Sequence, residues 1–98
     1  MLMHVIWEFI DNSEEGTARS LAVFQGWKPP QGADFKGFYA FADSEGGVAI
    51  IDVDSAATLA RTVAPFTPWL RFTARPIHPI EESAAIAGEG IAFRAGIS

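Results

Sequence analysis

Seven residues carry side chains that could bind or transform a small molecule: His4, Glu8, Tyr39, Asp52, Trp69, Arg71 and Arg75. Histidine titrates near neutral pH, so His4 is a candidate general acid or base. Tyr39 could donate a hydrogen bond to a substrate oxygen, and its role is then also catalytic. Arg71 and Arg75 fall on one face of a predicted strand, where guanidinium groups can hold a carboxylate through two parallel hydrogen bonds. This combination predicts a site for a small organic acid.

Each of these residues also has an ordinary structural interpretation. His4, Tyr39 and Trp69 could serve only in packing, and the two arginines could pair with Glu8 or Asp52 in salt bridges. The chain has two histidines and no cysteine, which excludes thiolate metal sites, disulfides and cysteine nucleophiles. No metal and no cofactor are therefore expected.

The strands and helices that position these residues can be predicted from the pattern of apolar residues and from the residues that begin and end each element. Runs rich in β-formers predict strands, whereas capping residues followed by a periodic apolar stripe predict helices. The expected strands cover 2–9, 33–42, 48–53 and 69–77, and the expected helices cover 13–25, 55–64 and 80–87. Gly88 and Gly90 are expected to break or loosen the last helix. The order is β-α-β-β-α-β with a C-terminal helical extension, which predicts a single ferredoxin-like α+β domain over 1–98. Such a fold has a four-stranded antiparallel sheet with two helices on one face.

Alternation along each strand assigns side chains to the helix-covered face or to the open face. Met3, Val5 and Trp7 fall on the helix side, as do Ala49, Ile51 and Val53, Leu70, Phe72 and Ala74, and Phe38, Ala40 and Ala42. The open face then holds all seven candidate residues together with large apolar ones: Leu2, Ile6, Phe35, Phe41, Val48 and Ile50. A solvated face would alternate with polar residues instead. We therefore expect a homodimer in which two sheets stack and enclose an apolar or aromatic acid.

Composition narrows the remaining classes. The chain has 98 residues, seven Lys and Arg against twelve Asp and Glu, and a net charge of -5. Nucleic-acid backbones and anionic membranes attract clustered positive charge, so neither is expected as a partner. The N-terminus lacks the basic region and cleavage site of a signal peptide, and no apolar run reaches the length of a membrane span. A cytoplasmic protein is expected.

Four segments are similar to a family of short bacterial proteins classified only as a domain of unknown function. They are HVIWEF at 4–9, KGFYAFADSEGGVAIID at 36–52, APFTPWLRF at 64–72 and PIEESAAIAGEGIAFR at 79–94. The resemblance extends over nearly the whole chain. It implies a relation to dimeric α+β barrel proteins, among them antibiotic-biosynthesis-type monooxygenases, muconolactone-isomerase-like enzymes and stress-responsive barrel proteins. No catalytic motif of the monooxygenases matches residues here, so the resemblance implies a fold and no activity.

Three functions follow as hypotheses. The first is a non-catalytic dimer that binds a small apolar or aromatic acid between its sheets, with Arg71 or Arg75 on the carboxylate. The second is a cofactor-independent enzyme of the monooxygenase or isomerase kind, with His4 as base and Tyr39 or an arginine stabilising developing negative charge. The third is a structural or interaction subunit whose interior is filled by its own side chains. A roomy interior would exclude the third.

Overall fold

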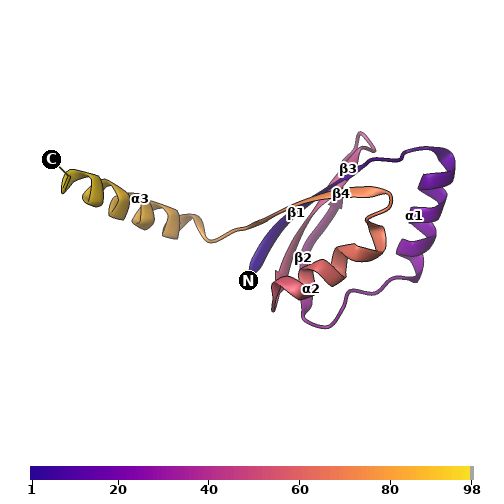
Figure 1. Ribbon diagram of the computed structural model, residues 1–98, viewed down its shortest axis with the longest axis horizontal. Helices are drawn as coiled ribbons and strands as arrows, with labels where there is room; N and C mark the ends of the chain where they lie inside the picture. The colour runs from indigo at the N-terminus through magenta and orange to yellow at the C-terminus, as the bar shows by residue number, and fades with distance from the viewer. Residues whose placement is uncertain (98) are drawn as a thin grey trace.

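The computed structural model describes residues 1–97, and its elements follow the order predicted from the sequence (Figure 1). They are β1 (Leu2–Phe9), α1 (Glu14–Gly26), β2 (Ala33–Ala40), β3 (Gly46–Val53), α2 (Ala56–Val63), the 3-10 turn η1 (Ala64–Phe66), β4 (Leu70–Pro76) and α3 (Ile80–Ala95). The strands form one antiparallel sheet in the order β2-β3-β1-β4. The predicted ferredoxin-like α+β fold is confirmed.

Local sequence explains where the first two helices begin. Ser13 caps α1 by accepting a hydrogen bond from the Gly16 amide at 3.1 Å, and Ser55 caps α2 through the Thr58 amide at 3.1 Å. Such caps satisfy amide groups that the helix itself leaves without partners. Asp11 accepts a hydrogen bond from the Ser13 amide at 3.1 Å, and hydrogen bonding with Ser13 holds the pKa of Asp11 below its usual value.

The core lies on the helix side of the two central strands. Met3 and Val5 of β1 pack with Ala49, Ile51 and Val53 of β3, and all five side chains are buried. The β1–β3 register places Met3 opposite Ile51 and Val5 opposite Ala49, which brings the predicted helix-side residues of both strands together. The predicted alternation of β1 and β3 is confirmed.

The predicted face of Phe35 in β2 is wrong, because β2 contains a β-bulge. Phe35 lies opposite Ile51, but the next paired residue is Gly37, opposite Ile50, so Lys36 is an extra residue. One inserted residue reverses the alternation on one side of it. Phe35 and Phe38 therefore both reach the helix side, with ring centroids 5.0 Å apart, and Tyr39 keeps its predicted open side opposite Val48.

Gly47 is required by the ring of Trp7, which lies across it from β1. A Cβ atom at Gly47 would overlap the Trp7 ring and the Tyr39 carbonyl oxygen. We expect Gly47→Ala to lower the free energy of unfolding by about 2 kcal/mol, since the ring has to leave its packed position. Gly88→Ala is the matched control, because a Cβ there meets nothing within 4 Å. Chemical denaturation of both variants checks this, and equal stabilities would contradict the role given to Gly47.

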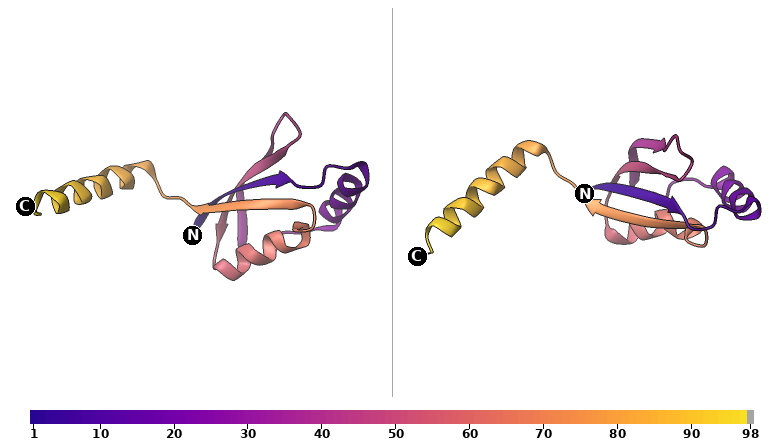
Figure 2. Two further views of the ribbon diagram at one scale, coloured as in Figure 1. Left: turned by 45° about the horizontal axis from the view of Figure 1, so that its top comes forward. Right: turned by 90° about the horizontal axis from the view of Figure 1, so that it is seen from above.

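The last helix differs from its prediction in length and in surroundings. It runs from Ile80 to Ala95 straight through Gly88 and Gly90, and the predicted end at residue 87 is wrong. α3 projects away from the sheet at the end of the molecule opposite α1, as Figures 1 and 2 show, and it buries no residue. The radius of gyration is accordingly 17.7 Å, against about 13 Å for a compact chain of this length.

Candidate functional site

A large cavity lies between the helix side of the sheet and the helices. Its volume is about 830 Å³, within the range typical of small-molecule sites. Residues from all four strands, from α1, α2 and η1, and from the β2–β3 turn line it. α2 packs against β2 and β3, whereas α1 packs against η1 and stands towards one end of the sheet (Figure 1). This offset of α1 leaves the cavity open beneath it.

Aromatic rings dominate the cavity wall. Ten of the twelve aromatic residues line it: Trp7, Phe9, Phe24, Trp27, Phe35, Phe38, Tyr39, Phe41, Phe66 and Phe72. Trp27 connects the helices to the sheet, since its ring lies 5.8 Å from Phe35 and 5.4 Å from Phe66, centroid to centroid, both edge to face. Phe38 similarly contacts Trp7 at 5.3 Å and Phe24 at 6.0 Å. The large aromatic content of a short chain is therefore gathered around one hollow.

The polar groups of the cavity are mostly neutral. The hydroxyl groups of Ser20 and Thr62, both buried, are used within their own helices, donating to the Thr17 carbonyl at 3.0 Å and the Thr58 carbonyl at 2.8 Å. Glu45 is the one charged residue among the lining residues described, and no lysine or arginine lines the wall. A ligand carboxylate would thus find no cation there, whereas a neutral apolar or aromatic molecule would meet matching surface.

Several side chains that line the cavity are exposed to solvent, and they form the entrance of the cavity. Leu21 and Phe24 of α1 are 52% and 46% exposed, and Phe38 of β2 is 43% exposed. Phe41, predicted to lie on the open face, also lines this cavity just beyond the end of β2 and is 38% exposed. Contiguous exposed apolar side chains are typical of ligand-binding or protein-binding surfaces.

The open face holds six of the seven sequence-predicted site residues. Between β1 and β4, His4 lies opposite Arg75 and Glu8 opposite Arg71, and between β1 and β3, Leu2 lies opposite Asp52. The Arg71 guanidinium donates to a Glu8 carboxylate oxygen at 3.3 Å, which confirms one of the predicted arginine–carboxylate pairs. Both side chains are more than half exposed, so this pair contributes little stability. Trp69 precedes β4, half-buried, and its carbonyl accepts from the Ile10 amide at 2.9 Å.

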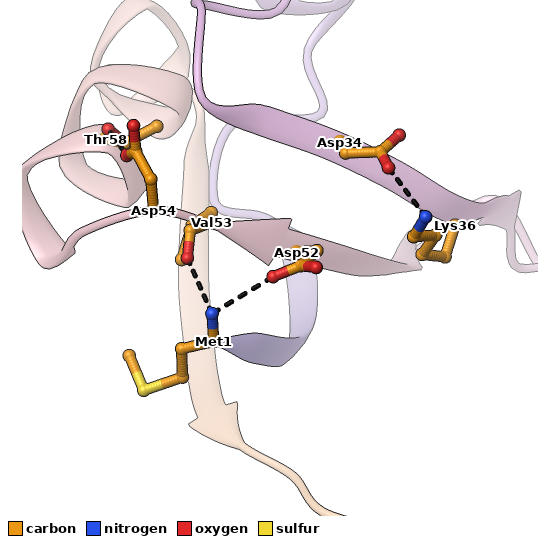
Figure 3. Close-up of polar contacts among 7 residues, drawn as sticks. All are labelled: Met1, Asp34, Lys36, Asp52, Val53, Asp54 and Thr58. Atoms are coloured by element: carbon orange, nitrogen blue, oxygen red, sulfur yellow. Dashed lines mark hydrogen bonds and ion pairs between the residues drawn. The ribbon is translucent and has the colours of Figure 1, made fainter.

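Asp52 has a different partner from the arginine that the sequence suggested. Its carboxylate accepts from the N-terminal amine of Met1 at 3.0 Å, which also donates to the Val53 carbonyl at 2.8 Å (Figure 3). Nearby, Lys36 pairs with Asp34 at 2.6 Å, and that carboxylate raises the pKa of Lys36. Arg75 forms no ion pair within residues 1–97.

His4 and Tyr39 share the open face but stand apart. β3 lies between their strands, so two strand spacings, about 10 Å, separate them across the sheet. None of the side-chain hydrogen bonds among the described residues involves the His4 ring, so no partner orients it. The two residues could act together only on a molecule that spans the gap. Tyr39, 67% exposed, is the one predicted site residue that also lines the cavity.

The sequence interpretation missed the cavity although one signal was present. The inner side of α1 carries Thr17, Ser20, Leu21 and Phe24. Two of these four are small and hydroxylated, so the helix presents an interrupted apolar stripe, which does not seal against a sheet as a continuous one does.

Comparison with known families now identifies the chain. The model of the family described as Domain of unknown function (DUF3303) matches residues 1–91, and the chain belongs to this family. No curated protein matches it. Within the described residues, no helix is long and apolar enough to cross a membrane, and no group of three or more potential metal ligands occurs.

Proposed function

We propose that this DUF3303 protein binds a small, neutral, apolar or aromatic molecule in the cavity beneath α1. One observation carries the proposal: a hollow of about 830 Å³ walled by ten aromatic residues and open at a rim of exposed apolar side chains. A cavity of that size accommodates a ligand of two to four rings, and such sites are mostly apolar with a few polar groups that fix orientation.

The test is a fluorescence titration of the full chain with N-phenyl-1-naphthylamine, a neutral aromatic probe. We expect saturable binding of one probe per chain at micromolar concentration, with energy transfer from Trp7 and Trp27 in the wall. 1-Naphthoate, an acid that keeps the naphthalene rings of the probe but not its phenyl ring, should bind at least tenfold more weakly, because the lining residues supply no cation. Arg75→Ala serves as the control. Because Arg75 lies outside the cavity, this variant should bind the neutral probe with unchanged affinity.

The same titration tests the acid site predicted from the sequence. Arg71 and Arg75 stand exposed on β4 and suit a carboxylate bound at the open face. Tighter binding of naphthoate than of the neutral probe, lost in Arg75→Ala, would favour that site and overturn the cavity proposal. Failure of the neutral probe to saturate would overturn it as well.

We also propose that the chain forms a homodimer through the open face of the sheet. Leu2 and Ile6 of β1 and Val48 and Ile50 of β3 make an apolar stripe along the two central strands of that face. Exposing such an apolar stripe to water is unfavourable. A two-fold symmetric dimer would bury the stripes of both chains in one interface. Light scattering at micromolar concentration should give twice the mass of one chain.

A further inference from the structure

α3 is a helix without a partner in its own chain. None of its residues is buried, and Ile80, Ile91 and Phe93 are 77%, 60% and 71% exposed. Isolated helices of this length are marginally stable in water, and most helices are held by the packing of an apolar side. The exposed apolar residues of α3 therefore leave a surface that packing against a partner would cover.

The helical period divides the apolar residues of α3 into two sets. Ile80, Ala84, Ala87 and Ile91 follow the spacing i, i+4, i+7, i+11 and share one side. Ile86 and Phe93, seven residues apart, lie on another side. Arg94 continues the first set at i+14, whereas Glu82 and Glu89 lie on the opposite side of the helix and Glu81 lies between the two sides. The first set makes a smooth stripe of two isoleucines with two alanines between them, which suits close contact with a flat surface.

The connection to β4 directs α3 away from its own sheet. The Ile77 amide still donates to the Leu2 carbonyl at 2.9 Å, so the strand ladder extends to that residue. Only His78 and Pro79 then precede the helix, and Pro79 has an extended backbone, with φ -57° and ψ 143°. Proline fixes φ and disfavours helical geometry in the residue before it. α3 therefore points outward, as Figure 2 shows in both views.

We propose that α3 is an exchanged arm that lies on the open sheet face of a second copy of this chain. The inference rests on the dimer proposed above and is independent of the cavity ligand. It accounts for both uncovered apolar surfaces, the stripe of α3 and the open sheet face. In a two-fold symmetric dimer, α3 of each chain lies on the open sheet face of the other chain, so the same contact occurs twice.

The dimensions of the two surfaces agree. A helix of 16 residues is about 24 Å long, and a strand of 8 residues such as β1 is about 26 Å long. A helix about 10 Å wide covers two strands spaced about 4.8 Å apart, which is the width of the apolar stripe on β1 and β3. The exposed guanidinium of Arg75 borders that stripe, where Glu81, which flanks the apolar side of an arriving arm, could pair with it.

The absence of cysteine from the sequence permits a direct cross-linking test. One variant carries Ala87→Cys on the stripe of α3, and the other carries Thr73→Cys on β4 beside Ile6 on the open face. The two full-length variants are mixed, denatured and refolded together, and treated with a short bis-maleimide. We expect a covalent heterodimer on a denaturing gel, in excess over either homodimer. Ala85→Cys, away from the stripe on the same helix, is the matched control for Ala87→Cys and should cross-link several-fold less.

The outcomes separate the arm from the dimer. A dimer by light scattering that cross-links only through Thr73→Cys pairs would overturn the exchanged arm and leave the dimer standing, since the two sheets would then face each other. A monomer would overturn both. Ile91→Lys should also shift the full chain to the monomer at micromolar concentration, whereas Ala85→Lys, which gains Glu81 as an i, i+4 partner, should remain dimeric.

Discussion

Replacing Trp27 by alanine is expected to lower the free energy of unfolding by about 3 to 4 kcal/mol. The ring stacks on Phe24 at 6.1 Å and meets Phe35 and Phe66 edge to face, so it joins the end of α1, strand β2 and the turn η1. Without it α1 keeps its cap but loses the contact that holds its C-terminal end over the sheet. For a chain of this size such a loss lowers Tm by more than roughly 10 °C.

Urea denaturation followed by circular dichroism measures this effect, with Trp27→Phe as the matched control. A phenyl ring keeps the edge-to-face contacts and loses only part of the buried area, so the control should lose less than half as much stability. The alanine variant should also lose binding of the neutral naphthylamine probe, because the wall of the cavity opens. Equal stability of Trp27→Ala and the unaltered chain would show that α1 is held by something other than this ring cluster.

The faces of the central strands could be predicted from the sequence because their alternation is unbroken. Met3 and Val5 alternate with His4 and Ile6 without an inserted residue, and the same holds for β3. In β2 both alternations are aromatic, and only the backbone reveals that Lys36 is the extra residue. The bulge changes the hydrogen-bond register, and no residue type in this segment signals it. The face on which Phe35 lies could therefore not be predicted from the sequence.

The end of α3 could not be predicted for a different reason. Glycine weakens a helix by about 1 kcal/mol relative to alanine, which argued for an end near Gly88. The alanines on both sides of Gly88 and Gly90 favour continuation, and no proline occurs between residues 80 and 98 to stop the helix. Propensity is a weak guide when neighbours conflict. Packing of the exchanged arm proposed above against a second chain would favour the continuous helix over an end at Gly88.

The candidate site was predicted only in part, because a cavity is a property of packing distance. The seven residues chosen from the sequence carry the chemistry of acids and bases, and six of them lie on the open face. The hollow instead arises where α1 stands away from the sheet, and its lining includes Phe35, Tyr39 and Phe41, which the alternation had assigned to the open face. What the sequence did contain was the excess of aromatic residues, ten of which line that hollow.

Filling the cavity from α1 is expected to weaken binding of the neutral probe about 100-fold, which corresponds to about 2.7 kcal/mol. Ser20 is 8% exposed on the inner side of α1, and its hydroxyl donates only to the Thr17 carbonyl of the same helix. Ser20→Phe therefore leaves no buried donor without a partner, and its ring enters the space that a ligand ring would take. It also covers apolar wall, so stability should be unchanged or rise by about 1 kcal/mol.

Ala22→Phe is the matched control, because Ala22 is exposed two residues further along the same helix and is absent from the cavity wall. The control should bind the probe as the unaltered chain does. Unchanged probe binding by a folded Ser20→Phe variant would place the probe elsewhere and contradict the cavity as its site. Weaker binding together with retained or increased stability separates an occupied hollow from a damaged fold, since damage would lower both quantities.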